Sequence, residues 1–324
     1  MKQLIFNQFG QPEDVTQIRE LEPASQLDDG QIRVKMLAAP INPADINYIQ
    51  GIYGVKPELP AVSGLEGCGE VIESASAEFS AGDKVIFIQR VGTWQSELIC
   101  PAESAVKVPA EIDAIQASML KVNPLTAWLI LREFENLKEG DYLIQNAANS
   151  GVGACVIQLA KSLGIKTINL VRREELIDSV IQLGGDEVFL DNKDVVASIK
   201  EKLGDVPIRL ASNAVGGDSA LRLMDALAPQ GTMVTYGAMS RRSLKVPNKF
   251  LIFKLITLRG LWVTEWMKTQ SRDQLQCVYS QLAELMVAGQ LAQPVDSIFS
   301  IDDAVAACLR AQEDKRDGKV VFEF

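Results

Sequence analysis

The sequence predicts an α/β protein with two domains, a β-rich domain and a domain built on a doubly wound parallel sheet. Three observations predict this architecture. The chain has 324 residues, more than one hydrophobic core usually organises. Short β-type segments separated by Gly, Pro and Asp dominate up to Ser104, whereas strand and helix patterns alternate from Tyr142 onward. We place the first domain at residues 1–122 and 265–324, and the second at residues 123–264.

The β-rich domain is expected to be irregular and largely antiparallel. Its clearest strands are Gln31–Met36, Gly69–Glu73 and Asp83–Phe87, each bounded by turn residues. The stretch from Pro40 to Gly67 is too broken by proline for one long element. It is also rich in Asn, Tyr and Glu, so we expect an ordered loop that carries a site.

The second domain is expected to repeat a strand, a tight turn and a helix. A helix at Leu125–Phe134 precedes the strand Tyr142–Gln145, the helix Val152–Leu163 and the strand Lys166–Val171. Further β-type segments are Glu187–Leu190, Arg209–Asn213, Thr232–Tyr236 and Thr257–Val263. This alternation indicates a parallel sheet covered by helices on both faces. The tail adds a helix at Asp273–Ala288 and a strand at Lys319–Phe324, which could return to the first domain.

The composition argues against several classes of protein. A hydrophobic content of 47% and a charged content of 23% are those of ordinary globular domains. A formal charge of −10 argues against nucleic-acid binding, and no apolar run has the length that spans a bilayer. The five scattered cysteines favour a reducing compartment. We expect a cytoplasmic protein, as in a bacterium, although a processed mitochondrial protein would look the same.

A candidate phosphate-binding turn lies between the strand at Tyr142–Gln145 and the following helix. Its sequence is Asn-Ala-Ala-Asn-Ser-Gly-Val-Gly, from Asn146 to Gly153. Small residues there let the backbone approach a pyrophosphate, which the helix N-terminus then binds. Only Gly153 matches a glycine of the G-x-G-x-x-G pattern, so small residues kept for packing are the alternative interpretation.

Arg172 and Arg173 follow the next strand, where NAD-dependent enzymes usually carry Asp or Glu. Two cations before a helix oppose its dipole, so a 2′-phosphate would explain them. We therefore predict NADP(H) as the cofactor. A solvated pair balanced by Glu174 and Glu175 is the alternative.

The arrangement of the domains resembles the medium-chain dehydrogenase/reductase superfamily, which joins a GroES-like catalytic domain to a Rossmann cofactor domain. Its zinc members use a Gly-His-Glu segment. The matching segment here is Ser63-Gly64-Leu65-Glu66-Gly67, and the chain contains no histidine. Glu66 alone cannot make that catalytic zinc site, so we expect no metal.

Several segments are similar to the zinc-free, mitochondrial-type trans-2-enoyl-thioester reductases. They are INPADINYIQGIYGVKPELPAVSGLEG, KVNPLTAW, IQNAANSGVGACVIQLAKSLGIKTINLVRR, GTMVTYGAM and LIFKLITLRGLWVTEW. The resemblance implies NADPH-dependent reduction of enoyl-CoA or enoyl-acyl-carrier-protein thioesters in fatty-acid synthesis, by a homodimer that pairs through Thr257–Val263. The alternatives are a quinone or enone oxidoreductase of the same superfamily, and a non-catalytic NADPH-binding protein.

Without histidine, the proton donor must be Tyr, Lys, a carboxylic acid, Cys or water. Tyr53 lies between two glycines and matches the tyrosine to which the family assigns catalysis. Tyr48 is the weaker candidate, and a tyrosine that only shapes the pocket wall is the bland alternative.

The resemblance also implies which residues bind the cofactor and the substrate. The implied cofactor contacts are Asn123, Asn149, Ser150, Gly151, Val152, Arg172, Arg173, Tyr236, Gly237, Ala238, Met239, Leu261, Trp262, Val263 and Lys319. The implied substrate pocket contains Asn42, Trp262 and Trp266. Several of these side chains could instead be core packing.

One segment of this acidic chain is basic, with Glu265 as its only acid. It contains Arg241, Arg242, Lys245, Lys249, Lys254, Arg259 and Lys268. Coenzyme A phosphates or an acidic carrier protein would be attracted to it, and solvated lysines are the ordinary alternative.

Overall fold

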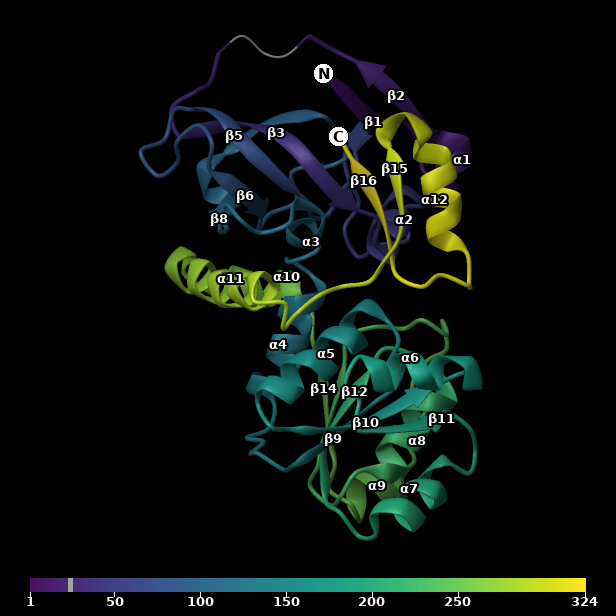
Figure 1. Ribbon diagram of the computed structural model, residues 1–324. Coiled ribbons are helices and arrows are strands. Elements are labelled where there is room, and N and C mark those ends of the chain that lie inside the picture. The colour runs from purple at the N-terminus through teal and green to yellow at the C-terminus, as the bar shows by residue number, and fades with distance from the viewer. Residues whose placement is uncertain (23–25) are drawn as a thin grey trace. The chain divides into compact units, whose positions relative to one another are not determined.

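The computed structural model describes residues 1–22 and 26–324 and divides the chain into two compact units (Figure 1). Unit 1 is Met1–Val122 with Gln270–Phe324, and unit 2 is Asn123–Thr269. The second boundary lies later than the expected position 265, because helix α10 (Val263–Lys268) belongs to unit 2. In the described ranges, every helix is too short or too polar to cross a membrane.

A seven-stranded sheet forms the centre of unit 1. Its order is β15-β16-β3-β5-β6-β8, and β7 pairs with β3. The strands are β3 (Gln31–Pro40), β5 (Cys68–Ser74), β6 (Lys84–Phe87), β7 (Glu97–Pro101), β8 (Ala105–Lys107), β15 (Val295–Ser300) and β16 (Lys319–Glu323). Alternate residues of β3, including Ile32, Val34 and Met36, are fully buried in one core. The pairing is antiparallel except between β15 and β16, so the first domain has the expected character.

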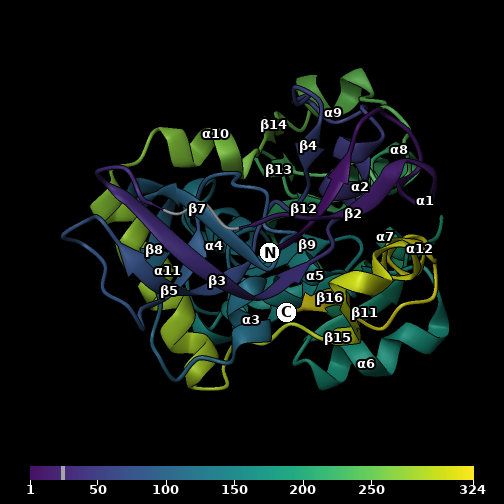
Figure 2. The same ribbon diagram turned by 90° about the horizontal axis from the view of Figure 1, so that it is seen from above.

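A smaller sheet and three helices enclose the second core of unit 1. The sheet is β2 (Thr16–Glu20), β1 (Lys2–Phe6) and β4 (Ala61–Val62), and the helices are α1 (Pro12–Val15), α2 (Pro43–Ile49) and α12 (Ala304–Gln312). Both views show α12 beside β15 and β16 (Figure 1 and Figure 2). The stretch expected to be a loop therefore contains α2, which begins because Pro43 occupies its first turn and Asn42 and Asp45 form a capping box.

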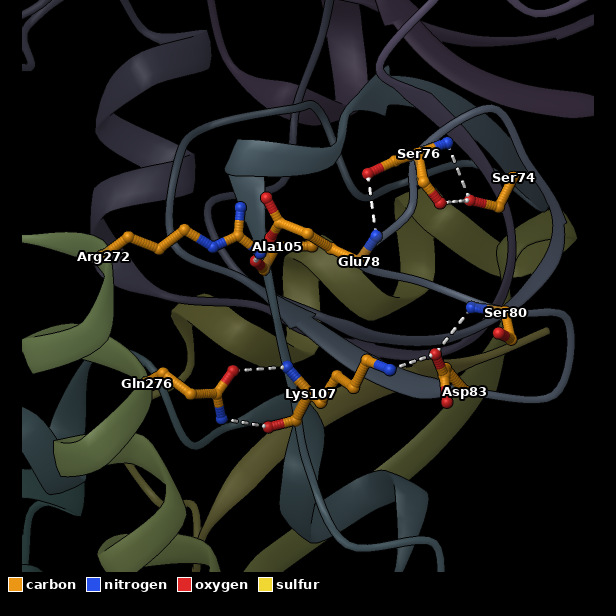
Figure 3. A network of polar contacts seen from close by, with 9 residues as sticks. All are labelled: Ser74, Ser76, Glu78, Ser80, Asp83, Ala105, Lys107, Arg272 and Gln276. Atoms are coloured by element: carbon orange, nitrogen blue, oxygen red, sulfur yellow. Dashed lines mark hydrogen bonds and ion pairs between the residues drawn. The ribbon is translucent and has the colours of Figure 1, made fainter.

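Helix α11 (Arg272–Val287) carries the chain back into unit 1 and is anchored to β8. The backbone N–H of Lys107 donates to Gln276 at 3.0 Å, and Gln276 donates to the Lys107 carbonyl at 2.9 Å (Figure 3). Arg272 donates to the Ala105 carbonyl and pairs with Glu78 at 2.9 Å. Short helix α3 (Ala114–Ser118) and the 3₁₀ turns Ala102–Ser104 and Ile301–Asp303 complete this unit.

Unit 2 has the predicted parallel sheet, with the order β11-β10-β9-β12-β13-β14. Its strands are β9 (Tyr142–Gln145), β10 (Lys166–Val171), β11 (Glu187–Leu190), β12 (Ile208–Asn213), β13 (Thr232–Thr235) and β14 (Thr257–Gly260). The expected strand 257–263 stops at Gly260, so Val263 and Trp266 lie on α10 instead.

Helices cover both faces of this sheet (Figure 1). Helices α4 (Asn123–Glu133), α5 (Gly151–Ser162) and α6 (Ile177–Gln182) lie on one face, the last after a 3₁₀ turn at Glu174–Leu176. Helices α7 (Val195–Leu203), α8 (Gly217–Ala226) and α9 (Asn248–Ile252) lie on the other. Separate apolar clusters, one including Ile157 and Val180 and the other Leu223 and Phe250, fill the two interfaces.

Candidate active site

The turn between β9 and α5, which the sequence predicts to bind a phosphate, is capped and tightly packed. Ser150 caps α5, and its Oγ accepts a hydrogen bond from the Gly153 N–H at 3.2 Å. A Cβ on Gly153 would lie 2.5 Å from the Ala148 carbonyl oxygen, so only glycine lets the helix approach the strand this closely. Asn149 is exposed and Ser150 is half-buried. The N-terminus of a twelve-residue helix is thus open to an anion.

Buried amides hold the carboxyl edge of the sheet behind this turn. Asn146 donates to Asn213 at 2.9 Å and to Ser219 at 2.8 Å, and its oxygen accepts from the Ala214 N–H. Ser219 in turn donates to Asp191 at 2.5 Å. We did not assign a role to Asn146 from the sequence. Polar residues that follow neighbouring parallel strands were the available signal.

The two arginines at the end of β10 differ in exposure and in pairing. Arg173 is half-buried, and its Nε lies 3.0 Å from the Glu175 carboxylate. Arg172 is exposed, and no carboxylate of the described ranges lies within ion-pair distance of it. Of the two guanidinium groups, that of Arg172 is therefore the more available to a phosphate.

The segment after β13 reaches the same turn. The Tyr236 hydroxyl is enclosed near Ser150 and Ser212, and burial raises its pKa. Gly237 packs so closely that a Cβ would lie 2.9 Å from the Ala214 carbonyl oxygen. Ala238 and Met239 are exposed. Within unit 2 the structure thus brings Tyr236 and the α5 turn together.

The other cofactor candidates of unit 2 lie near its first and last residues in the sequence. Asn123 begins α4 and is buried. Trp262 caps α10 and is 43% exposed, which does not fit the core-packing alternative. Leu261, Val263 and Trp266 are half-buried.

In unit 1, the end of α2 presents Tyr53. Gly51 has a φ of +72°, and the N–H groups of Ile52 and Tyr53 both donate to the Asn47 carbonyl. This turn leaves Tyr53 half-buried against the core. Tyr48 is only 7% exposed, and burial raises the pKa of its hydroxyl. Of the two candidate proton donors, Tyr53 is the accessible one.

Asn42 and Lys319 meet at a buried carboxylate. Asn42 Nδ2 donates to Glu66 Oε1 at 2.8 Å, and Lys319 Nζ donates to Asn42 Oδ1. Glu66 Oε2 accepts from the Val122 N–H at 2.9 Å. Both amide atoms of Asn42 are thus engaged within the protein, and the substrate role of Asn42 and the cofactor role of Lys319 stay predictions.

Two further charged residues near this carboxylate were not identified from the sequence. Lys121 is fully buried, donates to the carbonyls of Leu65 and Gln89, and has its pKa lowered by burial to about 7. The Arg90 guanidinium carbon lies 4.1 Å from the Tyr48 ring centroid and 5.6 Å from that of Tyr53. Arg90 lies in no quoted segment, and Lys121 begins the segment KVNPLTAW, which did not indicate a role for it because its partners are distant along the chain.

Comparison with known proteins identifies both halves of this arrangement. Residues 28–110 match the family model for the alcohol dehydrogenase GroES-like domain, and residues 151–283 match that for zinc-binding dehydrogenase. The enoyl-(acyl-carrier-protein) reductase, mitochondrial, of Rattus norvegicus is 42% identical over 94% of this chain and 83% of its own length.

Two solved structures have the same fold over the whole chain. The complex of Etr1p with NADP and crotonyl-CoA superimposes with a TM-score of 0.90 at 28% identity, covering 100% of this chain and 99% of its own. A putative NADPH:quinone reductase from Bacillus thuringiensis gives 0.89 at 29% identity, covering 100% and 98%. By this identity and coverage, the chain belongs to the enoyl-(acyl-carrier-protein) reductase family of the medium-chain dehydrogenase/reductase superfamily.

Proposed function

We propose that this protein uses NADPH to reduce the carbon–carbon double bond of trans-2-enoyl thioesters. The observation that carries the proposal is the half-buried Tyr53, which a glycine turn presents beside the Arg90 cation in a chain without histidine. The comparisons support it, because the rat relative is named an enoyl-(acyl-carrier-protein) reductase and the Etr1p structure holds NADP and crotonyl-CoA.

The cofactor and the chain would supply different parts of the reaction. NADPH, when bound, would be the source of the hydride for the β carbon of the enoyl group. Tyr53 would donate the proton of its hydroxyl to the α carbon, which completes the reduction. Tyr48 is too buried to replace it, and burial raises the pKa of the thiols of Cys68, Cys100 and Cys308 to about 12, which makes them poor acids.

The residues of unit 2 fit a phosphorylated dinucleotide. The N–H groups of Gly151 and Val152, the Ser150 side chain and the positive end of α5 suit the pyrophosphate, whereas the Ser150 N–H already donates to the Ala147 carbonyl. Arg172, with Arg173 in support, suits a 2′-phosphate and gives a preference for NADPH over NADH. The remaining contacts that we propose are Asn123, Asn149, Tyr236, Gly237, Ala238, Met239, Leu261, Trp262, Val263 and Lys319, with Asn42, Trp262 and Trp266 toward the substrate.

We propose that the reaction needs no zinc, although one matching family is named for it. Leu65 stands beside Glu66, and both oxygens of Glu66 already accept hydrogen bonds. Across the described ranges, no three His, Cys, Asp or Glu side chains gather where they could hold a metal ion. Activity that is unchanged by a strong chelator, in protein shown by elemental analysis to lack zinc, would support this.

A quinone or enone reductase is the second candidate, favoured by the likeness to the Bacillus thuringiensis structure. Steady-state NADPH oxidation with crotonyl, hexenoyl and longer enoyl thioesters, measured beside a quinone, separates the two. We expect the thioesters to have the higher kcat/KM. Protein that binds NADPH tightly but oxidises it with neither class would instead be a non-catalytic binding protein.

We also propose a homodimer that joins through β14. This strand is the edge of the six-stranded sheet, and apolar side chains beside it are exposed, with Phe253 at 80%. An unpaired edge next to an apolar surface favours pairing with a second copy. Sedimentation equilibrium tests this state. For location, the rat relative is named mitochondrial, so a processed mitochondrial form stands beside the cytoplasmic one as a proposal.

A further inference from the structure

Arg90 follows β6 and places a cation between two tyrosines of unit 1. Its guanidinium carbon lies 4.1 Å from the ring centroid of Tyr48 and 5.6 Å from that of Tyr53. Its side chain is 19% exposed, and Nη1 lies 3.7 Å from Oδ1 of the fully buried Asp45. Arg90 is therefore next to the proposed proton donor and shielded from most of the solvent.

Hydrogen bonds from the Nη atoms do not hold the Arg90 guanidinium in its position. Nη1 and Nη2 are enclosed and find no hydrogen-bond acceptor in the described part of the chain, and Oδ1 of Asp45 likewise finds no donor. Arg33, another buried arginine of unit 1, shows the usual solution, because it donates to Glu73 at 2.9 Å and to Glu97 at 3.0 Å. Enclosed donors without acceptors destabilise a fold, so a functional reason for Arg90 is needed.

Arg90 belongs to a cluster of buried ionisable groups. The cluster contains two carboxylates, Asp45 and Glu66, and two lysines, Lys319 and Lys121, and burial lowers the pKa of Lys121 to about 7. Lys121 and Lys319 interact electrostatically with Asp45 and Glu66, whereas Tyr48 and Asp45 on α2 lie directly against Arg90. A guanidinium keeps its charge at every accessible pH, so the field that reaches Tyr53 is permanent. Such a field favours an anion near Tyr53.

We infer that Arg90 is a positioning residue for Tyr53, and that its charge stabilises the phenolate that Tyr53 becomes after it donates its proton. The inference rests on the proposed function. When hydride adds to the β carbon, the electron pair of the double bond forms the new bond between the α carbon and the Tyr53 proton. The phenolate is left beside Arg90 and regains a proton from water.

The test is the pH profile of kcat for NADPH oxidation with crotonyl-CoA, from pH 6 to pH 10, in wild type and Arg90→Met. Loss of the cation should lower kcat at pH 7 by about 10- to 100-fold and move the alkaline limb upward. The KM for NADPH should not change, since Arg90 is not among the proposed cofactor contacts. Arg90→Lys should restore much of the rate, and Arg33→Met should leave the limb in place.

Several outcomes would overturn the inference. Wild type that is inactive with crotonyl-CoA removes the proposed function and the inference together. If wild type is active and the alkaline limb of the kcat profile does not move in Arg90→Met, the inference alone is removed. The same holds if Arg90→Met loses as much thermal stability as Arg33→Met and its alkaline limb does not move. If Arg90→Met does not fold, Arg90→Gln, which keeps a polar side chain and loses the charge, takes its place with the same expected shift.

Discussion

Tyr48 and Tyr53 are close in the sequence but lie in different surroundings. Tyr48 is part of the core of unit 1, whereas the turn at Gly51 carries Tyr53 to the surface of that core. The two arginines after β10 differ in the same way, since Arg173 has a carboxylate partner and Arg172 is exposed. At the scale of single residues, burial and ion pairing distinguish two candidate proton donors and two candidate phosphate ligands that are identical in residue type.

The pairing of Arg173 predicts unequal effects of the two arginines on cofactor choice. Arg172→Ala should raise the KM for NADPH by about 10- to 100-fold, because a charge-assisted hydrogen bond to phosphate is lost. Arg173→Ala should have a smaller effect, since Glu175 already neutralises part of that charge. The KM for NADH, measured in both variants, is the control and should change little. Equal effects on NADPH and NADH would contradict the assignment.

At the scale of elements, the sheet of unit 2 was the most predictable part. The bounds of β9, β10 and β11 agree with the sequence prediction, because each is a short β-type run between turns, buried in β9 and β10 and half-buried in β11. Helix α2 was missed, since its proline was interpreted as a breaker although Pro43 lies in the first helical turn. The predicted strand over 257–263 is longer than the observed β14, because apolar residues continue from β14 into α10.

The approach of α5 to β9 predicts a specific need for Gly153. Gly153→Ala should lower the free energy of unfolding by about 1–3 kcal/mol, because the added Cβ meets backbone oxygens. It should also weaken NADPH binding in a fluorescence titration. Gly260→Ala is the matched control, since a Cβ there meets nothing within 4 Å. Similar behaviour of the two variants would show that the turn does not depend on this contact.

The contact between α12 and β15 predicts a pH-dependent stability. Hydrogen bonds from Arg310, at 2.6 and 2.8 Å, lower the pKa of Asp296 to about 2. An acid with a lowered folded-state pKa stabilises the fold above its unfolded value and loses that contribution as the pH falls toward the folded value. Asp296→Asn should therefore lower the free energy of unfolding by about 1–2 kcal/mol at pH 7.

Urea unfolding of Asp296→Asn and wild type between pH 7 and pH 3 measures this difference. We expect it to be constant above about pH 4 and to shrink below that value. A difference that stays constant down to pH 3 would mean that the ion pair with Arg310 contributes little.

At the scale of the whole molecule, the fold class and the family followed from the sequence, whereas the charge cluster of unit 1 did not. Segments such as the Tyr53 loop and the α5 turn are local, so one stretch of sequence contains their signal. Asn42, Glu66, Lys121 and Lys319 come from distant parts of the chain, and only the folded sheet brings them together. Arg90 belongs to no motif, and its contact with Tyr53 depends on tertiary structure.

The basic segment after β13 predicts how the molecule distinguishes its substrates. Arg242 and Lys249 are exposed, whereas Lys254 and Lys268 already bond to neighbouring groups. The double variant Arg242→Glu and Lys249→Glu should raise the KM for enoyl thioesters by about 10-fold, since coenzyme A phosphates and carrier proteins are anionic. Small free enals should be unaffected, and Lys200→Glu on α7 is the control. An equal rise in KM for enals would show that the segment does not recognise the carrier group.

The central claim is that Tyr53 donates the proton in NADPH-dependent reduction of an enoyl thioester. The most direct test is kcat/KM for trans-2-hexenoyl-CoA in wild type and in Tyr53→Phe, which removes only the hydroxyl. We predict that wild type reduces the thioester and that kcat/KM falls by about 10²- to 10⁴-fold in the variant, because a positioned general acid is lost. NADPH binding should be retained. Turnover by Tyr53→Phe equal to that of wild type would contradict the account.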